Sequence, residues 1–190
     1  MKRLTIMIRS HRLLTLAALG LLVAAGSVAV YSGASFNFKT ANPSNIFTAG
    51  ILSHSNTKTG SAIVTATGME PSQTKVGTVT IKNTGNVAGT FSVGKSALVD
   101  TPGLNLGQIS TVLRIDVVDV TVPATPVSKY SGLLSAMGSV GLGTFAAGVS
   151  HDYQITLTFP DGGTPASNTT GDNAFQGSSM TCQLDWTSVQ

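Results

Sequence analysis

The chain ends in a segment in which apolar and polar residues alternate. In residues 181–187 the apolar positions hold Cys182, Leu184 and Trp186, and the positions between them hold Thr181, Gln183, Asp185 and Thr187. Successive side chains of a strand point to opposite faces, so this period of two predicts a half-buried β-strand. A chain that ends inside a strand usually closes a sheet, and the segment therefore favours a fold of packed sheets.

Other segments carry the same signal. Residues 150–159 alternate in the same way and end at the turn residues Pro160-Asp-Gly-Gly163. Residues 76–93 contain two strand-like runs around a Gly- and Asn-rich turn, and predict either a hairpin or a sheet-to-sheet corner. Within residues 113–122 the alternation changes phase at Val117-Val118, as a β-bulge or a register change does.

Shorter signals complete the predicted fold. Residues 47–55, 62–67 and 144–146 resemble further strands, and residues 128–138 predict a short helix with apolar residues at helical spacing: Tyr130, Leu133, Leu134 and Met137. Short β-branched segments separated by Gly, Pro and Asn predict an all-β antiparallel sandwich with short helical insertions. A closed barrel fits the same pattern almost as well.

The N-terminus predicts a signal peptide. Four basic residues within the first twelve positions precede an apolar run from Leu13 to Ala25, and small residues follow. The small residues Ser27-Val-Ala29 favour cleavage after Ala29, which gives a signal peptide of residues 1–29, and cleavage after Ala34 is a second option. An uncleaved membrane anchor is the alternative, because no charge follows until Lys39.

Charge and cysteine content narrow the function. The formal net charge of +3 comes from the leader, since the remaining chain has seven Lys and Arg against eight acids. The basic balance therefore argues for no nucleic-acid partner. Cys182 is the single cysteine, so no intramolecular disulfide framework forms, and its place on the apolar face of the last strand predicts a small buried side chain.

Six features lie in the same order as in a known group of exported proteins. They are the signal peptide, Asn45-Ile-Phe-Thr-Ala-Gly50, Met69-Glu-Pro-Ser72, Gly77–Gly85 with Val87–Phe91, Phe159-Pro160 and Asp172-Asn-Ala-Phe-Gln-Gly177. With them the chain resembles the TasA and camelysin (CalY) family, whose signal peptides are of the SipW-cognate type. The resemblance runs along nearly the whole chain.

This resemblance implies a jelly-roll-like β-sandwich over residues 46–190 and processing by a dedicated signal peptidase. It also implies a secreted subunit of extracellular matrix or cell-surface fibres that associates with itself and with minor fibre or anchor proteins. In such fibres the N-terminal segment of one subunit adds as a strand to the next. Within the N-terminal segment 30–45, residues 30–39 are the candidate donor strand, with assembly residues Tyr31, Phe36 and Phe38. An ordinary first strand of the same subunit is the alternative.

Some family members have been described as metallopeptidases, which makes a secreted metalloendopeptidase an alternative function. After cleavage only His54 and His151 remain, and the chain has no His-Glu-x-x-His motif for a zinc site. The candidate metal ligands are His54, His151, Asp152 and Asp161. We expect no enzyme and no cofactor, with Ca²⁺ or Zn²⁺ as the alternative. A monomeric cell-surface binding module is a third possibility.

The C-terminal segment 172–190 lacks a nucleophile, a base or a ligand pair. We predict that it is a structural clasp in which Asp172 and Asn173 order the turn and Phe175 plugs the end of the sandwich. The other clasp residues are Gln176, Gly177 and Trp186.

Overall fold

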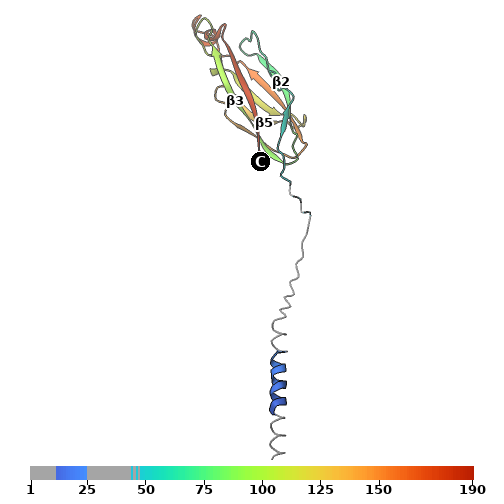
Figure 1. Ribbon diagram of the computed structural model, residues 1–190. Coiled ribbons are helices and arrows are strands. Elements are labelled where there is room, and N and C mark those ends of the chain that lie inside the picture. The colour runs from blue at the N-terminus through green and yellow to red at the C-terminus, as the bar shows by residue number, and fades with distance from the viewer. Residues whose placement is uncertain (1–11, 25–43, 45, 47) are drawn as a thin grey trace, which may run out of the picture. The chain divides into compact units, whose positions relative to one another are not determined.

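The computed structural model describes residues 12–24, 44, 46 and 48–190, and the chain divides into two compact units, Met1–Phe47 and Thr48–Gln190 (Figure 1). Residues 12–24 form an α-helix with exposed side chains. No helix in the described ranges combines the length and the apolar character needed to cross a membrane. The predicted cleavage positions and the candidate donor strand, with Tyr31, Phe36 and Phe38, lie outside the described residues.

The second unit is a sandwich of two antiparallel sheets. The five-stranded sheet has the order β1 (His54–Asn56), β2 (Thr74–Asn83), β7 (Ser150–Thr158), β4 (Arg114–Asp119), β5 (Val127–Leu133). The three-stranded sheet has the order β6 (Val140–Phe145), β3 (Gly89–Thr101), β8 (Ser179–Val189). Two short 3-10 helices, η1 (Ile109–Thr111) and η2 (Gly171–Phe175), lie in the connections. The prediction of an all-β antiparallel sandwich is confirmed.

The alternation of apolar and polar residues predicted the long strands β7 and β8 correctly. In β7 and β8 every second side chain turns inward, and Tyr153 and Trp186 are buried at 0 % and 9 % exposure. The pairing of β4 with β5 shifts register between Val117 and Val118, where the alternation changes phase. Residues 76–93 pass from β2 in one sheet to β3 in the other, so they form a sheet-to-sheet corner (Figure 1).

This corner is held by a buried side chain. Asn83 is fully buried, and its Nδ2 donates hydrogen bonds to the carbonyl oxygens of Val87 at 2.8 Å and Phe145 at 3.0 Å. Its Oδ1 accepts a hydrogen bond from the Gly85 amide at 3.0 Å. A buried side-chain amide needs hydrogen-bond partners, and here its hydrogen bonds link both sheets to the corner.

The predicted helix at residues 128–138 is wrong. Residues 127–133 form β5, which pairs with β4, and a turn follows in which the amide of Leu134 donates to the carbonyl of Leu113. Leu134 and Met137 are buried at 0 % and 3 % exposure because this turn folds back over the core. The helical spacing of apolar residues thus reflects a strand followed by a buried turn. Residues 62–67 also form no strand, and the signal at 47–55 gives only the short β1.

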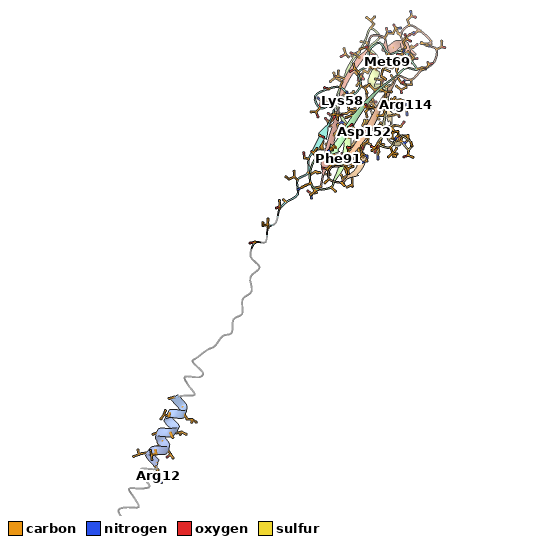
Figure 2. The ribbon with its side chains drawn as sticks, turned by 90° about the vertical axis from the view of Figure 1, so that its right-hand side faces the viewer. Arg12, Lys58, Met69, Phe91, Arg114 and Asp152 are labelled. Carbon is orange, nitrogen blue, oxygen red and sulfur yellow. The ribbon has the colours of Figure 1, made fainter. Side chains whose placement is uncertain are left out.

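The core fills the space between the sheets along the length of the sandwich. Figure 2 places Phe91 and Met69 toward opposite ends of it, and Met69 packs against the core from the segment before β2. The fully buried side chains include Ile81, Val93, Ile115, Val117, Tyr153 and Ile155. Removing these apolar surfaces from water is the main favourable contribution to folding.

Candidate functional site

The two histidines predicted as metal ligands lie on different strands and are kept apart by aromatic rings. Nδ1 of His54 lies 2.9 Å from Oγ of Ser188. The rings of Phe91 and Phe145 stack between His54 and His151, with successive centroid distances of 5.8, 4.1 and 4.3 Å. Two imidazoles separated in this way cannot share one ion.

The other predicted ligands have separate partners. Asp152 accepts a hydrogen bond from the Thr80 hydroxyl at 2.6 Å, and Asp161 accepts one from the Gly163 amide at 2.8 Å. Within the part of the chain that the structure describes, no three His, Cys, Asp or Glu side chains gather as a metal site would require.

His151 instead belongs to a polar cluster that the sequence did not reveal. Its Nδ1 lies 2.9 Å from Oδ2 of Asp119, whose Oδ1 accepts hydrogen bonds from the Thr121 hydroxyl at 2.6 Å and the Thr121 amide at 3.0 Å. Lys129 Nζ lies 4.0 Å from the same carboxylate. Burial raises the pKa of Asp119, but the hydrogen bonds of Thr121 and His151 outweigh burial and hold the pKa below its ordinary value. In the sequence, this cluster could have been recognised from the Asp-x-Thr spacing of Asp119 and Thr121 at the end of a strand.

The predicted clasp residues lie around η2. The Asp172 carboxylate accepts hydrogen bonds from the Gly162 amide at 3.0 and 3.1 Å, and the Asn173 carbonyl accepts one from Asn105 Nδ2 at 2.8 Å. The Phe175 ring meets Phe159 edge to face at a centroid distance of 6.1 Å. These contacts connect η2 to the turn after β7 and to the loop after β3.

Two further clasp residues, Gln176 and Gly177, extend this packing, whereas Trp186 lies in β8. Gln176 Nε2 donates to Asn173 Oδ1 at 3.2 Å, and Gly177 takes a left-handed backbone with φ of 73°. A Cβ on Gly103 would lie 1.9 Å from the Gln176 carbonyl oxygen, so the two backbones approach as closely as glycine allows.

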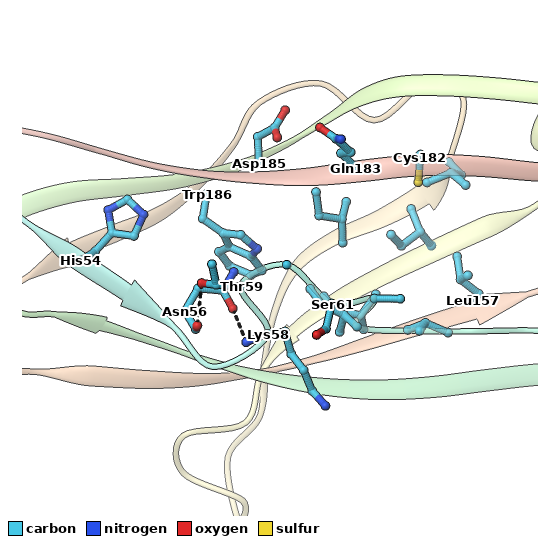
Figure 3. A pocket seen from close by; sticks show the side chains of 18 residues that line it. His54, Asn56, Lys58, Thr59, Ser61, Leu157, Cys182, Gln183, Asp185 and Trp186 are labelled. Carbon is cyan, nitrogen blue, oxygen red and sulfur yellow. Dashed lines mark hydrogen bonds between the residues drawn. The ribbon is translucent and has the colours of Figure 1, made fainter.

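A cleft of about 650 Å³ lies between β8 and the segment after β1 (Figure 3). Its floor is apolar, and the side chains that line it from below are Ile115, Leu134, Ile155 and Leu157. From β8 come Cys182, Leu184 and Trp186, and from the opposite side come Ala62, Ile63 and Val64. Figure 3 shows Trp186 projecting from β8 toward Asn56 and Thr59, whereas Asp185 points away.

Two polar groups near this cleft are buried without a partner. Trp186 Nε1 and the Tyr153 hydroxyl have no hydrogen-bond partner among residues 44–190 that the structure describes. Such groups are few in native proteins, and each calls for an explanation such as a ligand or water. Burial raises the pKa of Tyr153, and the charge of Asp119 raises it further. Burial also raises the pKa of the Cys182 thiol, with the charge of Lys95 opposing it.

The edge of β8 beside the cleft is free. β8 pairs with β3 along one edge, from Val189 opposite Thr90 to Ser179 opposite Thr101, and none of the strands in the described residues pairs with its other edge. The three-stranded sheet faces five strands, and in the described residues β8 and β6 are its two edge strands.

The fold and this site define a class of protein: an antiparallel β-sandwich with a long free edge strand bordering a cleft that has an apolar floor. A scan against protein-family models found no match, and a search of curated proteins found none either.

Proposed function

We propose that this chain is a secreted structural protein, a subunit of extracellular matrix or cell-surface fibres that assembles by donor-strand β-augmentation. Residues 1–29 are then a signal peptide removed on export, and the sandwich is of the jelly-roll type. The observation that carries the proposal is the free edge of β8 beside a cleft with an apolar floor.

A free edge of this length favours pairing with another chain. β8 has 11 residues, Ser179–Val189, and Asp185 is its single charged residue. Proteins that remain monomeric guard such edges with Lys, Pro, bulges or a covering segment, because unpaired N–H and C=O groups are a template for a further strand. The composition of β8 offers little of this protection.

The candidate donor matches this edge in length and pattern. Ten residues of strand, 30–39, span roughly 33 Å, and the 11 residues of β8 span a similar length at about 3.3 Å per residue. Phe36 and Phe38 fall on one face of a regular strand and fit an apolar floor, whereas Tyr31 falls on the other face. Backbone hydrogen bonds would supply affinity and the two phenyl rings would supply register.

The proposal is tested by electron microscopy and size-exclusion chromatography of the purified mature protein. We expect fibres from the mature chain and monomers from a variant that lacks residues 30–39. A mature protein that stays monomeric at high concentration with these ten residues intact would overturn the proposal.

A second candidate function is a monomeric binding module, because the cleft volume of about 650 Å³ lies within the usual range of ligand sites. A protein that remains monomeric but whose Trp186 fluorescence changes on adding a small apolar ligand would favour this function. A chelator-sensitive cleavage of casein that is lost in His151→Ala would favour the metalloendopeptidase instead.

A further inference from the structure

The two most exposed large apolar side chains of residues 48–190 lie in one short loop. Leu104 and Leu106 are 92 % and 79 % exposed, in the connection between β3 and η1. No other large apolar side chain is exposed within the described residues 100–112 and 159–178. We refer to residues 103–107 as the leucine loop. Two leucines that contact almost only water contribute nothing to the burial that drives folding.

The leucine loop is anchored on the segment around η2. The Asn105 Nδ2 donates hydrogen bonds to the carbonyl oxygens of Asn168 at 3.0 Å and Asn173 at 2.8 Å. The Gly107 amide donates to the Ala174 carbonyl oxygen at 3.1 Å, and a Cβ at Gly107 would lie 2.3 Å from that same oxygen. The loop is thus held through Asn105 and Gly107, while the leucines on either side of Asn105 stay in solvent.

The backbone of Leu106 is also unfavourable for this residue type. Leu106 has a φ of 62°, in the left-handed region that glycine and asparagine enter more easily than leucine. Its amide donates to the Gly103 carbonyl at 3.1 Å, which closes the turn. Leu106 therefore opposes the local backbone preference and gains no packing in return. Positions that depart from local preferences in this way are commonly functional, so the exposed pair calls for a partner.

The charges near the leucine loop are typical of a site for a neutral partner. Residues 101–109 carry no charged side chain, and residues 96–112 and 159–190 contain no Lys or Arg. Two neighbouring carboxylates are bonded to backbone amides: Asp100 accepts from the Ser110 amide at 3.0 Å, and Asp172 accepts from the Gly162 amide. An anionic partner would find no basic side chain in these segments.

The apolar surface is too narrow for a stable protein interface. Such an interface covers about 800 Å² on each partner and involves roughly 20–30 residues a side. Two leucines on one loop form a small projection instead. A lipid bilayer requires no matching surface, because apolar side chains that project from a protein can enter its interface directly. Leucine is among the side chains that enter hydrocarbon most favourably.

We propose that the leucine loop inserts Leu104 and Leu106 into the surface of a neutral phospholipid membrane. The anchoring on η2 limits the conformational freedom that the loop loses on insertion. With two apolar side chains the binding is weak and reversible, like that of a single lipid anchor.

This binding goes beyond the fibre function and does not depend on it. No residue of the leucine loop lines the cleft beside β8. The loop follows the end of β3 at which Thr101 pairs with Ser179, whereas Val189 pairs with Thr90 at the other end. Figure 1 shows the segment around η2 at the end of the sandwich far from the marked C-terminus.

Vesicle flotation of the mature protein, residues 30–190, tests the proposal, because vesicles carry bound protein upward whereas fibres sediment. We expect phosphatidylcholine vesicles to float the protein to the same extent at low and high salt. Leu104→Asn and Leu106→Asn should each weaken partitioning by about tenfold or more, since each removes one inserted leucine. Val127→Asn is the matched control, because Val127 is 52 % exposed in β5, and it should float like the parent protein.

Leu106→Asn separates binding from folding. Asparagine accepts the left-handed backbone better than leucine, so this variant should melt at the same or a higher temperature although it binds vesicles less. Both asparagine variants should form fibres like the parent protein, so failure of the proposal leaves the fibre function standing.

Three results would overturn the proposal. The first is that no protein floats with phosphatidylcholine vesicles, and the second is that both asparagine variants float like the parent protein. The third is flotation only with phosphatidylglycerol vesicles that high salt abolishes, which would assign binding to basic side chains outside the loop.

Discussion

The indole of Trp186 lies against the phenol of Tyr153, with ring centroids 5.4 Å apart and an interplanar angle of 42°. Both polar atoms of this pair, Nε1 and the hydroxyl oxygen, are buried without a hydrogen-bond partner among the described residues. Trp186 also lines the cleft beside β8, so a single contact joins the core of the sandwich to the site that we propose for assembly. This pair therefore predicts measurable effects on the stability of the protein.

Removing the Tyr153 hydroxyl should stabilise the protein. A buried hydroxyl without a partner costs about 1–3 kcal/mol, so we expect Tyr153→Phe to raise the free energy of unfolding by about 1 kcal/mol in urea. Tyr130→Phe is the matched control, because the Tyr130 hydroxyl donates to the Leu133 carbonyl at 2.9 Å and its loss should not stabilise. Equal effects of both variants would contradict the burial argument.

The same side chain predicts a loss of stability in alkali. The native state raises the pKa of Tyr153 above its ordinary value of 10.0, so the native state holds the phenolic proton more tightly than the unfolded chain. This contribution is fully present below pH 10 and is lost as pH rises above it. Urea titrations at pH 8 to 11 should show that the free energy of unfolding of the parent protein falls as pH rises, and that it falls less in Tyr153→Phe. An equal fall in both proteins would contradict the prediction.

The Asp119 carboxylate should stabilise the fold at neutral pH. Its pKa is held below the ordinary value of 3.8, so its contribution is present above that value and is lost as pH falls through the native pKa. We expect Asp119→Asn to lower the free energy of unfolding by about 1–2 kcal/mol at pH 7, with the difference shrinking at acid pH. Asp116→Asn, on the same strand, is the control and should change stability little. A difference that is independent of pH would contradict the assignment.

The Cys182 thiol should report on the occupancy of the cleft. It is half-buried, and burial raises its pKa, so labelling of the monomer by a maleimide should already be slow. We expect labelling in the fibre to slow by at least about tenfold further, because an added strand covers the cleft that Cys182 lines. The single tryptophan, Trp186, offers an independent fluorescence signal from the same cleft. If the labelling rate of Cys182 and the emission of Trp186 were the same in the fibre as in the monomer, assembly would not involve this cleft.

The clasp prediction can be tested by truncation. β8 pairs with β3 over its length and contributes Trp186 to the core, so we expect deletion of residues 180–190 to abolish cooperative unfolding. Phe175→Ala should cost about 1–3 kcal/mol, because the ring is only partly buried against Phe159. Thr169→Ala, on the exposed part of the same loop, is the control. A cooperatively folded truncated protein would show that the clasp assignment is wrong.

The sequence by itself determined where the long strands run and which faces they bury. The alternation in β7 and β8 and the change of phase at Val117-Val118 are local properties of a strand, and the structure has strands and a register shift at those places. The fibre function, the donor strand and the role of the clasp stay predictions.

Only the tertiary structure decided how these strands meet. Residues 127–133 pair with β4 although their apolar spacing favours a helix. Asp119 meets His151 from another strand, and residues 62–64 lie across a cleft from β8. Local periodicity reports which side chains share a face. It carries no information on contacts between residues distant in the chain, and such contacts decide strand pairing, buried polar clusters and open edges.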